Sequence, residues 1–452
     1  MGLKTVILAA GKGTRMKSNM PKVLHQIAGK SMLERVIEAG SCFGGEIIVV
    51  YGHGGEAVKS QINSNEIIWV EQAEQLGTGH AVQQAESEIA DDDTVLILYG
   101  DVPLTNAKTL EKLVDKVNEK VMALLTVTLA NPTGYGRIIR EDNIVKSIVE
   151  QKDADESQLL VQEVNTGILA VKGKQLKKWL SRLQSNNAQG EFYLTDIIEM
   201  AVNDGVVVET VSPASEYEVM GVNSKRELNT IERFYQRQQA DQLMDEGVTL
   251  ADANRIDIRG KLEILGQDIF IDANCIFEGN VKLAAGVRIG ANCVLQNVSI
   301  EENGIVKPNS VLESCSMGKN SSVGPFARIR PGAVLNNDVH IGNFVEVKKT
   351  TIGNGSKISH LSYIGDAEIG ENVNIGAGTI TCNYDGVNKF KTVIEDNVFI
   401  GSDTQLVAPV VVKKGATIGA GTTLTKEAPE GELTLSRSKQ ITLKGWKKPT
   451  KD

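Results

Sequence analysis

The 452-residue sequence contains no apolar run long enough to cross a bilayer, and aromatic residues make up only 4% of it. A membrane helix needs about 18 apolar residues in succession, so we expect no membrane-spanning segment. With few aromatic side chains and 44 glycines, the core must consist mainly of small and aliphatic residues. A chain of this length is expected to fold as two or more domains.

Paired cysteines and a basic surface are also missing. The five cysteines, at positions 42, 275, 293, 315 and 382, are odd in number and form no CxxC pair. We therefore expect reduced thiols in a cytoplasmic protein and no zinc site. The net charge of -9 argues against a general binder of nucleic acid or of membrane surfaces. The first apolar run is short and ends in GKGTR, which does not fit a secretory signal.

In the first half of the chain, short apolar runs alternate with stretches that have a helical pattern. The segments KTVILAAG, GEIIVVYG, EIIWVEQ, DTVLILYGD and VMALLTVTL are typical of buried strands, and 31–40, 80–90 and 106–118 are predicted helices. This alternation predicts an α/β domain with a largely parallel sheet covered by helices. Ligands of such sheets bind at the carboxyl ends of the strands.

The segment 227–247 is polar and has no glycine or proline before Gly247, which predicts a single helix. We interpret it as a connecting helix. The predicted organisation is therefore an α/β domain over 1–226, a helical linker over 227–247, and a second domain over 248–452.

The second domain has a different period. From Ile271, an aliphatic residue, Met or Phe recurs every five or six positions as far as Ile375, and the series resumes from Ile394 to Leu424. This period fits neither a helix nor an alternating strand, and it is too constant for an ordinary β-sandwich. It is typical of a parallel β-helix built from hexapeptide repeats, in which each short strand contributes one inward side chain.

The series is interrupted by TCNYDGVNKFKT at 381–392. A β-helix tolerates insertions at its corners, and Asn383, Asp385, Gly386 and Asn388 are residues that favour turns. We therefore interpret the interruption as a loop that leaves the coil near His360.

A glycine-rich turn, LAAGKGTRM, follows the first predicted strand. It is not a Walker A loop, because Gly13 stands where Ser or Thr is required, and it is not a GxGxxG fingerprint, because Met16 stands at the third glycine position. Its amide groups can still bind an anion, with Lys12, Arg15 and Lys22 nearby.

This turn, followed by Pro21-Lys22, resembles the signature of sugar-nucleotide pyrophosphorylases, and the match continues through further residues. These are Gln72, Gly77-Thr78, Tyr99-Gly100-Asp101, Gly134-Tyr135-Gly136, Glu150, Asn165 and Asn223. Together with the hexapeptide array, the chain resembles, from end to end, the bacterial bifunctional enzymes that acetylate glucosamine 1-phosphate and then join the product to uridylate. This resemblance implies a Rossmann-like first domain and a left-handed parallel β-helix, and a product, UDP-N-acetylglucosamine, that feeds cell-envelope synthesis.

For the first domain, the resemblance implies binding of UTP and of N-acetylglucosamine 1-phosphate by the residues just named together with Leu8, Ala9 and Gly11. Arg15 and Lys22 would neutralise charge at the α-phosphate, and Gln72, Gly77 and Thr78 would contact uracil. Gly136, Glu150 and Asn165 would hold the sugar. Mg²⁺ would bind Asp101 and Asn223, whose hard oxygen atoms suit this ion. Outside this context, Gly136 could equally be a turn and Asn165 a strand-end cap.

In the second domain, His360 follows the inward residue Ile358 and so is expected at a turn of the coil. An imidazole can take the proton of an amine during acetylation. The resemblance implies that His360 is this base and that Arg330, Lys348, Tyr363 and Asn374 hold glucosamine 1-phosphate. We also considered Glu346 as the residue that orients His360.

Acetyl-CoA would lie along the array between neighbouring subunits of a homotrimer, as the resemblance implies. The residues assigned to it are Ala377, Asn383, Tyr384, Ser402, Ala420 and Arg437. The tail after Ser436 is basic in an otherwise acidic chain and is either a solubilising end or an arm that meets the CoA phosphates.

Three other functions were compared with the bifunctional enzyme. A zinc-dependent carbonic anhydrase on this fold needs three histidines, and the array holds only His340 and His360. A monofunctional pyrophosphorylase whose array only oligomerises, and a non-catalytic trimeric binding protein, remain open on the sequence.

Overall fold

The computed structural model describes residues 2–52, 54–62 and 64–450. The chain divides into two compact units, Met1–Tyr235 and Gln236–Asp452. The division falls inside the helix α8 (Lys225–Asp245), which confirms the helix expected over 227–247. The domain boundaries at 226 and 247 stay a prediction.

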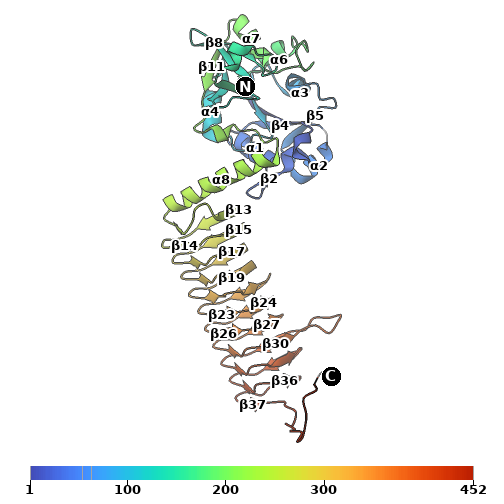
Figure 1. The fold of residues 1–452 in the computed structure, drawn as a ribbon, viewed down its shortest axis with the longest axis vertical. Coiled ribbons are helices and arrows are strands. Elements are labelled where there is room, and N and C mark those ends of the chain that lie inside the picture. The colour runs from blue at the N-terminus through green and yellow to red at the C-terminus, as the bar shows by residue number, and fades with distance from the viewer. Residues whose placement is uncertain (1, 53, 63, 451–452) are drawn as a thin grey trace. The chain divides into compact units, whose positions relative to one another are not determined.

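Unit 1, coloured blue to green in Figure 1, is built on a mixed sheet with the strand order β11-β7-β10-β6-β1-β4-β5. The bounds are β1 Leu3–Ala9, β4 Glu46–Tyr51, β5 Ile67–Glu71, β6 Thr94–Tyr99, β7 Val121–Thr128, β10 Glu163–Lys172 and β11 Val207–Val211. A hairpin, β8 (Arg137–Glu141) and β9 (Ile144–Val149), extends from β10. The predicted largely parallel sheet is confirmed, with β10 antiparallel to both β6 and β7.

Helices cover both faces of this sheet, because successive strand residues point to opposite sides. Val6 and Leu8 pack with α3 (Thr78–Gln84), α6 (Gly173–Leu180) and α7 (Asp196–Asn203). Ile7 and Ala9 pack with α1 (Met32–Ser41) and α4 (Ala107–Asp115) on the other side. The remaining short elements are α2 Gly55–Ile62, α5 Glu156–Leu159, the 3-10 turns η1 Thr14–Met16, η2 Lys22–Leu24, η3 Glu86–Glu88 and η4 Glu216–Glu218, and the strands β2 Gln26–Ile27 and β3 Lys30–Ser31.

The register of the parallel strands brings together the segments that contain the expected ligand-binding residues. Leu8 of β1 lies beside Tyr99 of β6, and Ala9 lies beside Tyr51 of β4, which in turn pairs with Glu71 of β5. These strands end at the same edge of the sheet. The segments that follow them, at 10–13, 100–101 and 72–77, therefore meet there, as parallel sheets require of a ligand site.

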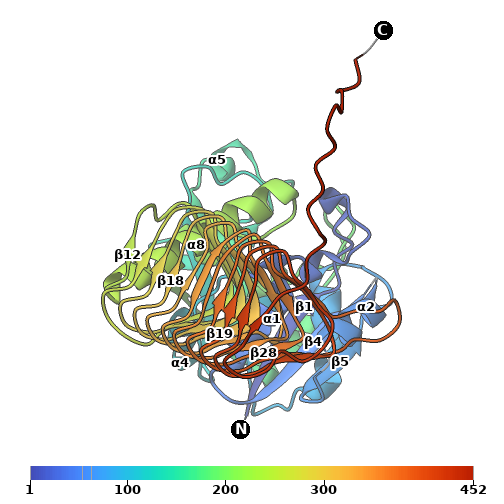
Figure 2. The same cartoon turned by 90° about the horizontal axis from the view of Figure 1, so that it is seen from below.

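Unit 2 is a parallel β-helix, and each strand pairs in parallel with a strand of the next coil (Figure 2). One face consists of β12 Thr249–Leu250, β14 Phe270–Ile271, β16 Arg288–Ile289, β18 Ile305–Val306, β20 Ser322–Val323, β23 His340–Asn343, β26 Lys357–His360, β29 Asn374–Ile375, β32 Phe399–Ile400, β35 Thr417–Ile418 and β37 Leu433–Thr434. Longer strands form the first coils of the other faces: β13 Ile256–Ile264, β15 Cys275–Leu283, β17 Val294–Ile300 and β19 Val311–Met317.

After β19 the other two faces separate. One contains β21 Arg328–Ile329, β24 Glu346–Lys348, β27 Tyr363–Gly365, β30 Ile380–Cys382, β33 Gln405–Val407 and β36 Thr423–Leu424. The other contains β22 Val334–Leu335, β25 Thr351–Ile352, β28 Ala367–Ile369, β31 Thr392–Ile394 and β34 Val410–Val412.

The residues of the hexapeptide series form the core of this unit. All of them, from Ile271 to Leu424, are buried, and they pack into one continuous cluster. Corners where φ is positive are mostly occupied by Asn, Asp or Gly, which tolerate the left-handed conformation. The predicted parallel β-helix is confirmed.

The predicted interruption is wrong at its ends. Thr381 lies in β30 at an inward position and is only 1% exposed. Its Oγ1 accepts a hydrogen bond from Gly365 N at 2.8 Å and donates one to Gly365 O at 3.1 Å. A polar residue can occupy this core position because both of its hydrogen-bonding functions are satisfied. The loop that leaves the coil is therefore shorter, running between β30 and β31 (Figure 1).

Candidate active sites

The carboxyl edge of the unit 1 sheet holds a cavity of about 240 Å³. Most of the residues expected to bind UTP line it: Leu8, Ala9, Gly11, Lys22, Gln72, Gly77, Thr78, Tyr99 and Asp101. Gly100 lies behind them and donates its N–H to Leu8 O at 2.9 Å. The structure therefore gathers at one place residues that are spread over a hundred positions of sequence.

The glycine-rich turn approaches this cavity closely. Gly13 has a φ of 60°, and a Cβ at this position would lie 2.7 Å from Cβ of Lys22. Only glycine fits this contact without moving the backbone. Arg15, in the exposed turn η1, is not part of the cavity lining.

Two oxygen ligands converge beside the same cavity. The ammonium group of Lys22 forms an ion pair with Asp101 and lies 3.1 Å from Asn223 Oδ1. Asn223 is held there by its backbone, whose N–H donates to Glu227 Oε2 at 2.8 Å. A carboxylate and an amide oxygen thus already surround a cation, which is the donor chemistry that Mg²⁺ prefers.

The three residues expected to hold the sugar are also neighbours. Asn165 N donates to Gly136 O at 2.9 Å, and a Cβ at Gly136 would lie 3.3 Å from Glu150 Oε1. Burial raises the pKa of Glu150 above its usual range, while a hydrogen bond from Thr195 Oγ1 opposes this effect. Burial likewise raises the pKa of Tyr99, which also senses the charges of Glu150 and Asp101.

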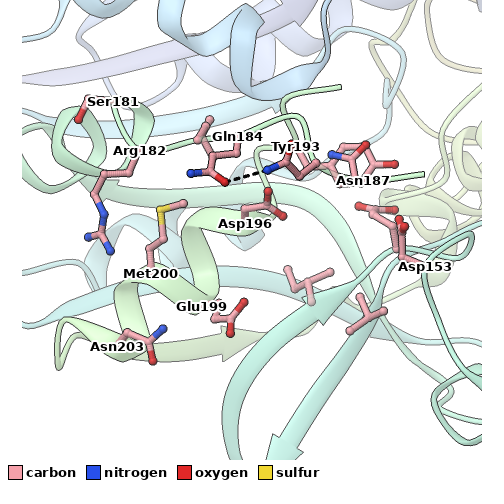
Figure 3. Close-up of a pocket in the computed structure, with 15 residues that line it drawn as sticks. Asp153, Ser181, Arg182, Gln184, Asn187, Tyr193, Asp196, Glu199, Met200 and Asn203 are labelled. Carbon is pink, nitrogen blue, oxygen red and sulfur yellow. Dashed lines mark hydrogen bonds between the residues drawn. The ribbon is translucent and has the colours of Figure 1, made fainter. Parts of the chain in front are cut away.

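Glu150 also borders a second, larger cavity of about 800 Å³ (Figure 3). Its lining includes the acidic residues Asp153, Asp196 and Glu199, with Arg182 on a neighbouring segment. Burial and the nearby carboxylates of Glu199 and Glu150 raise the pKa of Asp196 to about 6. No sequence motif signals this cavity, because its residues come from three separate segments, 148–153, 181–187 and 193–203.

In unit 2, His360 lies at the exposed end of β26. Its Nδ1 lies 2.6 Å from Asn343 Oδ1, in the strand of the preceding coil. An amide oxygen can only accept, so Nδ1 carries the proton and Nε2 keeps its lone pair. The arrangement therefore presents a base on the outer surface of the coil.

Glu346 does not orient His360, contrary to the alternative considered from the sequence. Its Oε1 accepts a hydrogen bond from Arg330 Nη1 at 2.7 Å and so forms an ion pair with this residue. Parallel pairing places Tyr363 in the next coil directly beside Glu346. The spacing between the two coils made Glu346 plausible, but the register selects Asn343 as the neighbour of His360.

The remaining cationic groups gather near Tyr363. Lys348 pairs with Gly365 in the neighbouring strand, and a hydrogen bond to Lys348, together with the charge of Lys348, lowers the pKa of Lys389. Lys389 comes from the loop between β30 and β31 and was not among the expected residues. Asn374 lies on a different face of the coil, in β29, beside Lys357.

Four of the residues expected to bind acetyl-CoA follow one corner of the coil. Ala377 O accepts from Asp403 N at 2.7 Å, and Ser402 O accepts from Gly421 N at 2.8 Å, so Ala377, Ser402 and Ala420 stack in successive coils. A Cβ at Gly419 would lie 3.0 Å from Nη2 of Arg437, which places Arg437 beside this corner.

Asn383 and Tyr384 lie at the base of the projecting loop instead. The Asn383 side chain is buried and donates to Asp366 Oδ2 at 2.5 Å, while Tyr384 is 59% exposed. The loop is ordered by its own contacts: Asp385 Oδ1 accepts from Val387 N and from Asn388 N at 2.8 and 2.6 Å. Its tip residue, Val387, is 84% exposed.

Within the described ranges, no group of three or more His, Cys, Asp or Glu side chains is arranged to hold a metal ion. Asp101 and Asn223 are a smaller set than that, and Mg²⁺ bound together with phosphates needs only one or two protein carboxylates. None of the helices in the described part of the chain combines the length and apolarity of a bilayer span.

Comparison with protein families matches residues 5–151 to the MobA-like NTP transferase domain. Residues 262–352 match the GMPPB C-terminal domain, and residues 391–426 match the bacterial transferase hexapeptide (six repeats). These matches correspond to the two units that the structure shows.

The chain is 58% identical over 450 residues to the bifunctional protein GlmU of Thiobacillus denitrificans. The aligned residues cover 99% of this chain and 98% of that protein. A solved structure of a nucleotidyl transferase from Methanothermobacter thermautotroptrophicus matches 52% of this chain and 99% of its own length, at 18% identity and a TM-score of 0.39. At this score the structural match adds nothing to the assignment.

Proposed function

The chain belongs to the family of bifunctional GlmU proteins, and on this premise we propose how its residues divide two reactions between the two units. Unit 2 transfers the acetyl group of acetyl-CoA to glucosamine 1-phosphate. Unit 1 then transfers uridylate from UTP to N-acetylglucosamine 1-phosphate and releases pyrophosphate. The observation that carries this proposal is that the residues expected for each reaction gather in separate places, one in each unit.

In unit 1, a phosphate oxygen of N-acetylglucosamine 1-phosphate attacks the α-phosphorus of UTP, and the bond to the β-phosphate breaks. The attacking oxygen is already ionised, so no general base is needed. The work of the protein is to align the two phosphates and to neutralise their charge. The backbone of Gly11 borders the cavity, and Lys22 provides a positive charge for the phosphates. Gly136, Glu150 and Asn165 hold the sugar.

Asp101 and Asn223 would hold Mg²⁺, since their oxygen atoms already converge on the ammonium group of Lys22. When bound, this ion supplies charge neutralisation at the phosphates. Lys22 contacts both residues and so connects the glycine-rich turn with the carboxylate.

In unit 2, His360 is placed as the general base. Its Nε2 takes a proton from the amino group of glucosamine 1-phosphate as the nitrogen forms a bond to the carbonyl carbon of acetyl-CoA. The carbon–sulfur bond then breaks and CoA leaves as the thiolate. The sugar phosphate is held by Arg330, Lys348 and Tyr363, and Asn374 contributes from the neighbouring face. The CoA chain lies along the corner formed by Ala377, Ser402 and Ala420, with Arg437 at the end of this corner. Asn383 and Tyr384 contact CoA from the base of the projecting loop.

We also propose that the chain works as a homotrimer in the cytoplasm. An exposed column of Phe326, Phe344 and Leu361 on the coil supports assembly, because bulky apolar side chains there face outward. Phe326 and Phe344 stack with ring centroids 5.4 Å apart. The cysteines are all free thiols, which suits a reducing compartment.

A reconstitution assay tests the proposal. The purified chain is supplied with glucosamine 1-phosphate, acetyl-CoA, UTP and Mg²⁺, and UDP-N-acetylglucosamine and pyrophosphate are measured. Omitting acetyl-CoA must abolish product, and N-acetylglucosamine 1-phosphate must restore it without acetyl-CoA. Product formation only from the acetylated sugar would favour a monofunctional pyrophosphorylase, and no product at all would favour a binding protein.

A further inference from the structure

His80 is a half-buried neighbour of Gln72, and the reaction described above assigns no role to it. Gln72 follows β5, is only 3% exposed and lines two cavities, the one of about 240 Å³ and another of about 410 Å³. The Nε2 atom of Gln72 lies 3.1 Å from Gly77 O and 3.1 Å from His80 Nδ1. Both hydrogens of the Gln72 amide are therefore engaged.

These contacts fix which end of the Gln72 amide is available to a ligand. Gly77 O can only accept, so the nitrogen of the amide must face it. The hydrogen bonds of the Gln72 side chain to the described residues are all made by its nitrogen. The side chain thus offers an acceptor, and no donor, to whatever binds beside it.

The contact with Gln72 requires one tautomer of neutral His80. Nδ1 must accept from Gln72, so the ring proton lies on Nε2. The amide nitrogen of Gln84, on the same helix α3, lies 3.1 Å from His80 Nε2 and 3.2 Å from His80 O. Since both nitrogens are donors in this tautomer, Gln84 packs against the ring and donates its hydrogen bond to His80 O. The ring also lies against Phe192, with centroids 6.4 Å apart.

We propose that His80 is a positioning residue that holds the Gln72 amide with its oxygen toward the base of the nucleotide and so selects uracil over cytosine. Uracil presents an N3–H donor, which an amide oxygen accepts. Cytosine presents a lone pair at N3, which the same oxygen repels. This inference rests on the proposed uridylyl transfer and adds to it the source of the preference between the two pyrimidines.

Two substitutions at this position distinguish the proposal from a structural role. The amide of Asn can reach the place of Nδ1, so His80→Asn keeps an acceptor for Gln72. The longer Gln reaches the place of Nε2, so His80→Gln keeps the contact to Gln84 and loses the one to Gln72. The two variants are both polar and are close in size.

The measurement is kcat/KM for UTP and for CTP with N-acetylglucosamine 1-phosphate, on the full chain. The UTP preference should fall by about tenfold or more in His80→Gln, because one hydrogen bond that orients the amide is lost. It should stay within about threefold of the unsubstituted chain in His80→Asn. Acetyl transfer by the same preparations, together with their melting temperatures, reports whether each chain is folded.

Equal UTP preference in His80→Gln and the unsubstituted chain would overturn the proposal. An equal loss in both variants would also overturn it, because a general structural role predicts that result. An unsubstituted chain that uses neither nucleotide would instead contradict the proposed uridylyl transfer itself. If His80→Gln does not fold, Gln84→Met gives the second test: it leaves the Nδ1 contact in place but frees the ring, and the UTP preference should fall.

Discussion

Asn343 Oδ1 lies 2.6 Å from Nδ1 of His360, in the neighbouring coil of the β-helix. The pair is set by strand register, because Asn343 and His360 face each other where β23 and β26 run in parallel. The amide fixes the ring orientation and leaves Nε2 free to accept a proton. A residue that no sequence motif singled out therefore determines how the predicted base is presented.

Replacing this partner should slow acetyl transfer. In Asn343→Ala the imidazole loses its orientation, and kcat should fall by about tenfold, less than the full ~10²–10⁴-fold that a general base contributes. Steady-state acetyl transfer measures this change, and uridylyl transfer should be unchanged. An Asn343→Ala chain with full acetyl transfer would contradict the role of the pair.

The same position allows a test by pH. In Asn343→Asp a carboxylate faces the ring and stabilises the imidazolium. The base is then free only at higher pH, and the acidic limb of the pH–rate profile should move to higher pH, with little loss above it. A limb that stays in place would show that His360 does not act as the base.

The projecting loop should matter for activity and little for the coil. Residues 384–390 lie between two strands whose core positions, Thr381 and Ile394, remain in place without them. Replacing 384–390 with two glycines should raise KM for acetyl-CoA or for the sugar phosphate and lower kcat. Size-exclusion chromatography should show the same oligomer and calorimetry a similar melting temperature. A loss of the oligomer would mean that the loop holds the subunits together.

Thr381 offers a test of the polar core position. Thr381→Val keeps the shape of the side chain but removes both hydrogen bonds to Gly365, and it leaves the buried N–H of this glycine unpaired. The free energy of unfolding should fall by about 1–3 kcal/mol. Denaturant unfolding measures the change. An increase in stability would show that an aliphatic residue suits this position as well as it does elsewhere in the series.

The raised pKa of Asp196 predicts that the stability of unit 1 depends on pH. Its pKa is raised to about 6, so the folded chain holds a proton at a pH where the unfolded chain has released it. The contribution of Asp196 to stability is therefore best at low pH and declines as pH rises from about 4 to about 6. Asp196→Asn should raise the melting temperature of unit 1 at pH 7 and change it little at pH 4. Equal effects at both values would contradict the raised pKa.

The fold was predictable where the spacing of hydrophobic residues along the sequence reveals it. Buried strands such as 94–99 and the series from Ile271 to Leu424 follow directly from hydrophobic spacing. Thr381 escaped this reasoning because a satisfied hydroxyl in the core has no hydrophobic signal. The antiparallel strand β10 could not be distinguished from a parallel one, since both are apolar runs.

Site residues that belong to sequence motifs were predictable. Site residues that are brought together by the alignment of strands and helices were not. Resemblance located the residues around Lys22 and Asp101, which the structure gathers at one cavity. Asn343 and His80 act through neighbours 17 and 8 positions away in sequence. Those contacts depend on how coils and helices align in space, which a motif does not encode.

The central claim is that one chain carries two independent active sites, and a pair of substitutions tests it most directly. Both reactions are assayed separately on His360→Ala and on Asp101→Asn. His360→Ala should abolish acetyl transfer and leave uridylyl transfer nearly intact, whereas Asp101→Asn should abolish Mg²⁺-dependent release of pyrophosphate and spare acetyl transfer. Loss of both reactions in either folded variant, or of neither in both, would contradict the account.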